Sequence, residues 1–580
     1  MERSERKRQN FLMPASAVLL TMAFGVNAVA EEEAILREQA LKVLGKHVFF
    51  DTDLSMPKGN QACVSCHEPF AGGTSGFSDV NETTVGVPGA NFDTDPTAIG
   101  GRKPPSNTYA TFSPSFSVAP FPPSPDGPCF GLSVSGFCGG NFWDGRSQGE
   151  STDGLIFRDA GTAGPHLGME VFYNIENAAI MAFAKYRGPT SDQALNPMPN
   201  AVEQNIGRKE VCELVAESTY SPLYKLAWGE DIDCSSTYAY LGETHYDISF
   251  KRMMLAVGAY QHSEDINSFS SKRDIALRSE LACDGYSFPE HYNPAVCKKL
   301  YKSGKEPGKF PLMLLTDQEN EGHDLFYGEA GCQFCHSNKP TIAFGPFNFP
   351  GDDGTELEQT YTDHGYHNIG VPVNALIPKF NGPDTGANNH QLGALDGLHR
   401  TPTLRNVTKG EKSNFVKAYT HSGWFKTLEG LVHFYNTSRN FGDEAGQKKR
   451  CEELFPEQET FTMAEALANN CWPAPEFNTG LAPANFVGNI GLTEDQEAAL
   501  VAYIKTLNDQ HTAKTPVLVK SNSFHMSPVA MLFATEKWSE EICEMGTPSN
   551  GVYSVKVKSP KNCVRFKDLL DILGEGYWVK

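Results

Sequence analysis

The sequence predicts a mainly α-helical protein built from two tandem domains of similar design. Two copies of one motif, Cys-x-x-Cys-His, lie far apart in the chain, and helical patterns surround each copy. The chain of 580 residues is also longer than the ~250–300 residues that a single hydrophobic core usually spans. Its 53 glycines and 37 prolines favour many ordered loops between the helices.

The first thirty residues have the pattern of a secretory signal. Residues 1–10 are basic, residues 11–26 are apolar, and the small residues of "NAVA" end at Ala30. This order is typical of a signal peptide that is cleaved after Ala30, and the apolar stretch is short for a membrane span. A short membrane anchor is the alternative. We expect export to the periplasm and no membrane span.

The formal net charge of −21 restricts the class of partner. Residues 1–30 hold four basic and two acidic residues, so the remaining chain carries −23. This charge repels nucleic acid and anionic membrane surfaces. A basic protein partner is compatible with it, although a net negative surface also simply favours solubility.

Ten of the fourteen cysteines fall into neighbouring couples. In an oxidising compartment, local disulfides are the simplest account of such couples. The expected pairs are Cys129–Cys138, Cys212–Cys234, Cys283–Cys297, Cys451–Cys471 and Cys543–Cys563.

The other four cysteines belong to "ACVSCHE" at 62–68 and "GCQFCHS" at 331–337. Cys-x-x-Cys-His is the attachment pattern of c-type haem: the thiols bond to the porphyrin and the histidine binds the iron. A zinc site would need further paired ligands, and none is suitably placed. We therefore expect two covalent haems. The predicted residues are Cys63, Cys66 and His67 for the first, and Cys332, Cys335 and His336 for the second.

Helical patterns accompany both motifs. Apolar residues recur at helical spacing over residues 36–44, and Gly45 is a candidate for the end of that helix. Capping-box patterns begin at Thr316 and Thr493, and the second leads into an apolar-faced segment. Helices around each haem indicate cytochrome c-like domains. The predicted division is residues 1–30 as signal peptide, 31–305 and 306–510 as the two domains, and 511–580 as a small C-terminal extension.

Further segments lie in a specific order around the two motifs. They are "LGKHVFFDTDLS" before the first motif, "FWDGR" at 142–146, "LTDQENEGHDLF" before the second motif, "YHNIGVP" at 366–372, "TPTLRNV" at 401–407 and "LEGLVHFYN" at 428–436. In this order the chain resembles the bacterial di-haem cytochrome c peroxidase and MauG family. The resemblance covers most of residues 40–510 and not the last 70 residues.

The resemblance implies a sixth ligand for the second haem. In the family this ligand lies fourteen residues after a histidine turn, and it is methionine in the peroxidase branch and tyrosine in the MauG branch. Here the turn contains His421, and fourteen residues on is Tyr435. A hard phenolate donor lowers the reduction potential of the iron. The alternative is that Tyr435 only packs a helix, and Ser422 departs from the aspartate usual in this turn.

The resemblance also implies a peroxide site at the first haem. The family has a blocking histidine after the first motif, but residues 68–165 contain no histidine. In a later insertion, His166 or Met169 could close the iron instead. The segment "DQALNPMPNAVE" matches a family motif in which Gln193 holds peroxide and Glu203 relays a proton. Without the motif, Glu203 would be interpreted as a solvated acid.

Two further family positions are informative. Trp143 in "FWDGR" matches an indole that relays electrons between the haems, and a buried core tryptophan is its alternative. Lys103 stands where the family has an asparagine ligand to calcium. Because an ammonium group can replace the metal, calcium is in doubt. Extra segments at 113–141, 220–310 and 440–490 either shape a partner site or stabilise the fold.

The expected function is peroxide-dependent oxidation. Hydrogen peroxide would react at the first haem, and an electron donor would be oxidised in turn. The donor is either a small redox protein, such as a cytochrome c or a cupredoxin, or a side chain of a protein substrate. A di-haem electron carrier without catalysis is the alternative of another class, and a haem-dependent dioxygenase is a more remote one.

Overall fold

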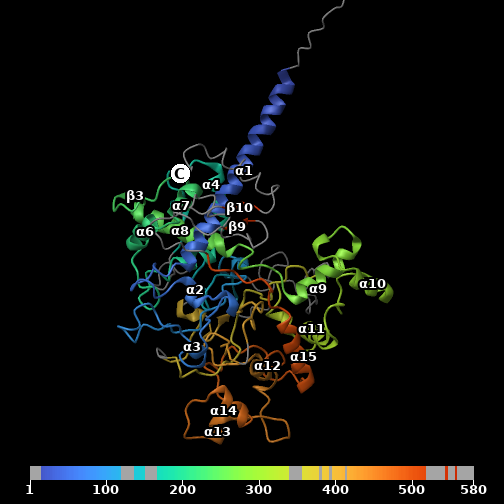
Figure 1. The fold of residues 1–580 in the computed structure, drawn as a ribbon. Helices are drawn as coiled ribbons and strands as arrows, with labels where there is room; N and C mark the ends of the chain where they lie inside the picture. The colour runs from blue at the N-terminus through green and yellow to red at the C-terminus, as the bar shows by residue number, and fades with distance from the viewer. Residues whose placement is uncertain are drawn as a thin grey trace, which may run out of the picture.

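The computed structural model describes residues 15–118, 136–149, 166–338, 356–377, 382–390, 395–411 and 414–516, with two short strands at 543–545 and 555–557. The described part is mainly helical, as predicted (Figure 1). Its α-helices are α1 (Ala15–Phe50), α2 (Cys63–Cys66), α3 (Ser78–Glu82), α4 (Ala178–Met181), α5 (Pro189–Ala194), α6 (Arg208–Glu217), α7 (Ser221–Trp228), α8 (His245–Gln261), α9 (Lys272–Leu281), α10 (Pro294–Ser303), α11 (Asp317–Tyr327), α12 (Leu428–Thr437), α13 (Cys451–Leu454), α14 (Met463–Ala468) and α15 (Glu494–Lys505).

Short 3-10 helices and two-residue or three-residue strands connect these helices. The 3-10 helices are η1 (Pro69–Ala71), η2 (Ala110–Phe112), η3 (Met169–Phe172), η4 (Ala182–Tyr186), η5 (Ala282–Asp284), η6 (Pro289–His291), η7 (Cys332–Phe334) and η8 (Ala387–His390). The strands form antiparallel pairs β1–β2 (Ser117–Val118 and Phe137–Cys138), β3–β4 (Tyr238–Tyr240 and Glu243–Thr244), β5–β6 (Tyr366–His367 and His399–Arg400) and β9–β10 (Cys543–Met545 and Val555–Val557). One parallel pair joins β7 (Lys449–Arg450) to β8 (Cys471–Trp472).

The N-terminal half is organised by α1, which packs along α7 and α8 (Figure 1). The prediction that Gly45 ends this helix is wrong, because α1 continues to Phe50. A Cβ atom at Gly45 would lie 1.9 Å from the carbonyl oxygen of Ala256 on α8. The glycine therefore serves the close contact of two helices rather than a helix end.

The C-terminal half is organised by α11, which packs against α15, and α15 also contacts α12. Both predicted capping boxes are confirmed: Thr316 accepts a hydrogen bond from the Glu319 backbone at 3.2 Å, and Thr493 accepts one from Gln496 at 3.3 Å. Buried apolar residues form two main clusters, one within residues 36–266 and one within residues 325–507.

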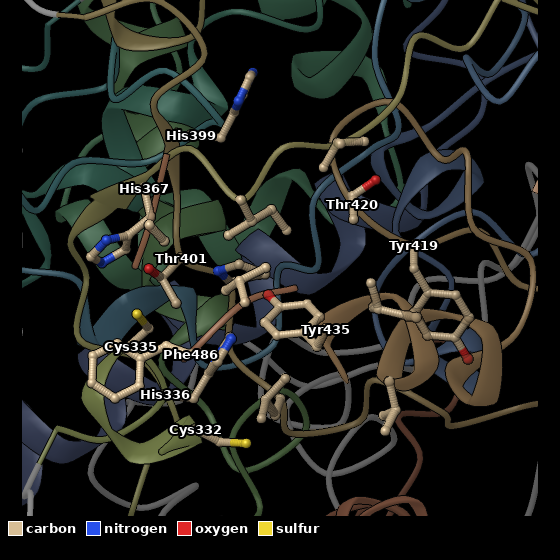
Figure 2. A pocket seen from close by; sticks show the side chains of 18 of the residues that line it. Cys332, Cys335, His336, His367, His399, Thr401, Tyr419, Thr420, Tyr435 and Phe486 are labelled. Atoms are coloured by element: carbon tan, nitrogen blue, oxygen red, sulfur yellow. The ribbon is translucent and has the colours of Figure 1, made fainter. Parts of the chain in front are cut away.

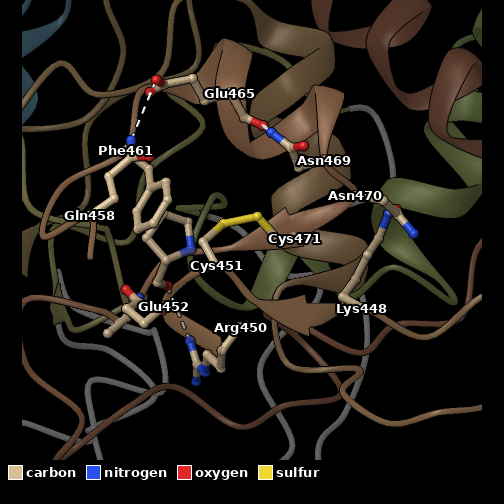
Figure 3. The surroundings of a disulfide bond; sticks show 12 residues. Lys448, Arg450, Cys451, Glu452, Gln458, Phe461, Glu465, Asn469, Asn470 and Cys471 are labelled. Carbon is tan, nitrogen blue, oxygen red and sulfur yellow. Dashed lines mark hydrogen bonds between the residues drawn. A yellow bond between two sulfur atoms is a disulfide. The ribbon is translucent and has the colours of Figure 1, made fainter. Parts of the chain in front are cut away.

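Three of the predicted disulfides are confirmed. They are Cys212–Cys234, Cys283–Cys297 and Cys451–Cys471. The last of these joins the start of α13 to β8 in the segment that the sequence marks as extra material (Figure 3). Cys138 is disulfide-bonded, and its predicted partner Cys129 lies outside the described residues, as does Cys563.

The first helix contains the predicted cleavage point at Ala30. Among the residues that the structure describes, no helix combines the length and the apolar composition needed to cross a bilayer.

Candidate functional site

The first Cys-x-x-Cys-His motif forms one wall of a cavity of about 600 Å³, called here the first cavity. The two thiols of Cys63 and Cys66 are free, and they sit on the single helical turn α2. The backbone of His67 closes this turn by donating to the Cys63 carbonyl at 3.1 Å. The spacing of the motif thus brings both thiols and the imidazole to one side of the cavity.

The imidazole of His67 is oriented by a hydrogen bond that leaves its other nitrogen available to bind a metal. Its Nδ1 lies 3.0 Å from the Gly73 carbonyl oxygen, which leaves Nε2 without a proton. Burial lowers the pKa of His67, so the ring is neutral. Histidines that bind metals commonly donate their other N–H to a backbone carbonyl in this way.

The second motif lies at a separate cavity of about 390 Å³, called here the second cavity. Cys332 and Cys335 carry free thiols, and Nδ1 of His336 lies 3.2 Å from the Tyr361 carbonyl oxygen. Burial lowers the pKa of His336 to about 4. Figure 2 shows these side chains together with Tyr435 around the cavity.

The donor sets fit covalent haem at both cavities. Each cavity has two unpaired thiols, a neutral imidazole with one nitrogen already bonded to a carbonyl, and largely apolar surroundings in the second case. Their volumes are within the ~300–1,000 Å³ typical of cofactor sites. This fit is independent of any comparison with other proteins.

Tyr435, the predicted sixth ligand, comes from α12 and lines the second cavity. Burial raises the pKa of its phenol well above the ordinary value. A phenolate at this position therefore needs a nearby cation, and a ferric iron in the cavity would provide one.

Gln193 and Glu203 both line the first cavity together with His67. Helix α5 ends at Ala194, and the chain after it turns so that Gln193 and Glu203 line the same cavity. Asn200 donates a hydrogen bond to the Glu203 carboxylate at 2.6 Å. Burial raises the pKa of Glu203 above its ordinary value, against the opposing effects of the Asn200 hydrogen bond and the Arg146 charge.

Trp143 lines both cavities and is 6 % exposed. Its indole N–H donates to the carbonyl oxygen of Lys103 at 2.8 Å. The side chain is thus a buried core tryptophan and also a common wall of the two candidate haem sites. The two alternatives considered for it from the sequence are not exclusive.

The two residues that could close the first iron lie outside the described lining of both cavities. Nδ1 of His166 lies 3.1 Å from the Asp192 carboxylate, and Met169 is 48 % exposed. Among the described residues, the lining of the first cavity contains no imidazole other than those of His67 and His421.

Lys103 occupies a buried position beside the first cavity. Its ammonium group donates to the Thr74 hydroxyl at 2.9 Å and to the Pro104 carbonyl at 3.2 Å. Burial lowers the pKa of Lys103 to about 7. The position that matches the family's calcium ligand therefore presents a hydrogen-bond donor and no oxygen side chain.

Several residues at the junction of the cavities were missed by the sequence analysis. Glu476 lines both cavities, as does His421 of the predicted turn, and His399 lines the second. Arg102 and Asp384 line the first. Glu476 lies within the extra segment 440–490, so the sequence carried no signal that it reaches the site.

Comparison with known proteins agrees with this geometry. The family model described as di-haem cytochrome c peroxidase matches residues 39–282. The methylamine utilization protein MauG of Paracoccus denitrificans is 24% identical over 491 residues, which cover 83% of this chain and 91% of that protein. The chain is therefore similar to the di-haem cytochrome c peroxidase and MauG family, over residues 39–282 by the family model and over most of its length by this relative.

A second relative is similar over most of its length. The cytochrome-c peroxidase IdrP2 of Denitromonas iodatirespirans is 23% identical over 463 residues, which cover 74% of this chain and 84% of that protein. Two c-type haems are the cofactors that the matching family model implies.

Two solved structures are similar to the whole molecule. The diheme peroxidase BthA from Burkholderia thailandensis gives a TM-score of 0.49 at 20% identity, with 82% of this chain and 88% of that chain covered. A MauG-like protein associated with microbial copper homeostasis gives a TM-score of 0.43 at 19% identity, with 81% and 90% covered.

Proposed function

We propose that the chain is a periplasmic di-haem oxidoreductase that uses hydrogen peroxide to oxidise an electron-donor protein or a protein side chain. One observation carries the proposal: Trp143 lines both cavities, and each cavity contains a Cys-x-x-Cys-His motif. Because an indole can lose and regain an electron, a tryptophan common to two cofactor sites divides a long electron transfer into two shorter ones.

The proposed organisation follows from the two apolar clusters. Cys63 packs against the first cluster and Cys332 against the second, which supports one cytochrome c-like domain around each motif. The proposed division is a signal peptide at 1–30, an N-terminal domain at 31–305, a C-terminal domain at 306–510 and an extension at 511–580. Calcium is not part of the proposal, because the Lys103 ammonium stands at the matching position.

The residues of the first cavity have two roles: some attach the haem, and others transfer a proton or orient peroxide. Cys63, Cys66 and His67 would hold a c-type haem, which would supply a redox-active iron for the reaction with peroxide. Glu203 moves a proton from one peroxide oxygen to the other, and the Gln193 amide orients the substrate. A half-buried carboxyl whose pKa is raised suits this role, since the shift moves its pKa toward the neutral range in which proton transfer is most effective.

The residues of the second cavity would hold the second haem, whose iron would supply a second redox centre. His336 and Tyr435 would bind this iron, and a hard phenolate donor would favour the oxidised side of the iron couple. Tyrosine at this position favours the MauG-like branch over the branch with methionine. The electron donor is either a small cytochrome c or cupredoxin, or an oxidisable side chain of a protein substrate.

The test is the electron paramagnetic resonance spectrum of the ferric protein before and after stoichiometric hydrogen peroxide. We expect one high-spin and one low-spin ferric signal, both lost when peroxide is added. Two low-spin signals that do not change would contradict the proposal and support an electron carrier without catalysis.

The variant Glu203→Gln isolates the proton step. General acid–base groups typically contribute about 10²–10⁴-fold, so the rate of the peroxide reaction should fall within this range while haem content stays the same. The control is Glu210→Gln, an exposed acid on the neighbouring helix α6. If the rate of the peroxide reaction were the same in both variants, Glu203 would not transfer the proton.

A further inference from the structure

The junction between the two cavities contains a buried acid that the proposed function does not use. Glu476 and His421 each line both cavities, and Oε2 of Glu476 lies 2.9 Å from Nε2 of His421. Their side chains are only 6 % and 5 % exposed. A carboxyl–imidazole pair at this distance shares a proton.

The backbone of Glu476 is anchored to the second half of the molecule. Its N–H donates to the Val371 carbonyl at 2.9 Å, and the preceding Pro475 forms an isolated bridge with Pro372. The disulfide Cys451–Cys471 closes the same extra segment shortly before Glu476 (Figure 3). These contacts fix the backbone of the segment, so the Glu476 carboxyl group is held at the junction.

The imidazole of His421 connects this acid to the aromatic groups of the junction. Its ring centroid lies 6.3 Å from that of Trp143, with an edge-on geometry at 69°. On the other side, the ring of His399 stacks on it at 3.5 Å and 6°. Nδ1 of His399 lies 3.0 Å from the Gly397 carbonyl oxygen, and its Nε2 lies 3.4 Å from the Asp384 carboxylate.

The other charges around the junction are already compensated. Arg102 donates to Asp384 at 2.6 and 2.7 Å and to Asp144 at 2.7 Å, and Arg146 also donates to Asp144. These two cations and two anions cancel. The ammonium of Lys103 points to Thr74 and Pro104. The charges that can still change between the cavities are therefore those of the Glu476–His421 pair and of Lys103, whose pKa burial lowers to about 7.

We propose that the Glu476–His421 pair holds one exchangeable proton and releases it when a redox centre beside it loses an electron. The step is balanced: one electron leaves the centre, one proton leaves the pair for solvent, and the junction keeps its net charge. Re-reduction by the donor returns both. Burial raises the pKa of Glu476 to about 8 and lowers that of His421, which supports a single shared proton at neutral pH.

This inference rests on the proposed function only in taking the two cavities as haem sites. Its test is the reduction potential of each haem, measured by spectroelectrochemistry from pH 6 to 9 without peroxide. For a one-electron couple, a tenfold change in proton concentration corresponds to at most ~59 mV. We expect the potential of at least one haem to fall with rising pH toward this slope, and to be nearly independent of pH in Glu476→Gln.

Two further measurements make the test specific. The redox-induced infrared difference spectrum should show a protonated carboxyl band that is lost on oxidation and is absent in Glu476→Gln. Glu476→Asp should keep both the slope and the band. The control Asp233→Asn breaks an exposed carboxylate–histidine pair, with His245 at 3.2 Å, and should change neither.

The proposal would be overturned by potentials that do not depend on pH in the wild-type protein. It would equally be overturned by an unchanged slope in Glu476→Gln, because the proton would then belong to another group, such as a haem carboxylate. Loss of the peroxide reaction with an intact slope would contradict the proposed function and leave this inference standing.

Discussion

The backbone N–H and C=O groups of Lys103 join Trp143 to His421 through two hydrogen bonds. The indole N–H of Trp143 donates to the Lys103 carbonyl at 2.8 Å, and the Lys103 N–H donates to the His421 carbonyl at 2.9 Å. The two aromatic rings, 6.3 Å apart, are therefore held in position by one residue between them. Both rings line both cavities, so their relative position determines how the cavities communicate.

The first prediction concerns Trp143→Phe. The free energy of unfolding should fall by about 1 kcal/mol because the hydrogen bond to Lys103 is missing. It should fall further because the smaller phenyl ring leaves a cavity. Haem content should stay the same, but peroxide should remove only the high-spin ferric signal, because the route between the cavities is lost. The measurement is electron paramagnetic resonance after stoichiometric peroxide.

A matched control for this variant is Trp424→Phe. Trp424 is also buried and donates its indole N–H to a backbone carbonyl, that of Phe461, at 2.7 Å. It does not line either cavity within the described residues. Wild-type loss of both signals in Trp143→Phe would show that the indole is not the relay.

The second prediction concerns Tyr435→Met. A thioether stabilises Fe(II) relative to a phenolate, so the potential of the second haem should rise by on the order of 100 mV, within the ~0.8 V range that axial ligands span. Spectroelectrochemistry measures this directly. Tyr419→Phe is the control, because Tyr419 lines the same cavity while its hydroxyl donates to Glu411 at 3.1 Å. No difference between the two variants would leave Tyr435 as a packing residue.

The third prediction concerns acid stability. Burial alone would raise the pKa of Glu356, but His323 at 2.9 Å and Arg273 at 2.8 Å outweigh it and lower the pKa to about 2. A carboxyl with a depressed folded-state pKa stabilises the fold above its unfolded value near pH ~4.3 and loses this contribution as the pH falls toward 2. The contribution is about 3 kcal/mol at neutral pH.

Urea unfolding at pH 7 and pH 3 tests this prediction. Glu356→Gln should be destabilised by about 3–5 kcal/mol at pH 7, because the buried Arg273 guanidinium loses the closer of its two carboxylates and keeps only Asp274 at 3.2 Å. The difference in the free energy of unfolding between variant and wild type should be smaller at pH 3. Glu321→Gln, an exposed position on α11, should follow the wild type at both pH values. If this difference in unfolding free energy were the same at pH 7 and pH 3, the Glu356 carboxylate would not be the source of the acid sensitivity.

The fourth prediction concerns the disulfide Cys451–Cys471. Replacing both cysteines by serine opens a loop of 20 residues, which should cost about 3 kcal/mol of unfolding free energy. Replacing Cys283 and Cys297 opens a loop of similar length and should cost a similar amount. Thermal unfolding compares the two variants. We expect only the first to alter the pH dependence of the haem potentials, because only its loop leads to Glu476.

The local features of this protein were predictable from the sequence alone. The Cys-x-x-Cys-His motifs, the capping boxes at Thr316 and Thr493 and the disulfides of 14–22 residues separation depend on residues close together in the chain. Short spacings leave few alternative geometries, so the residue pattern and the local structure correspond. Gly45 is the exception, because its role depends on the contact with α8, which lies about two hundred residues away.

The tertiary structure decided how the two sites meet. The contacts of Glu476 with His421 and of Arg102 with Asp384 span 55 and 282 residues, and no periodicity or motif signals them. The ligand and catalytic roles of Tyr435, Gln193 and Glu203 stay predictions, although these residues line the expected cavities. Long-range packing decides which polar side chains are buried together. The sequence therefore determined that two haem motifs exist, and only the fold determined that a tryptophan, a histidine and an acid lie between them.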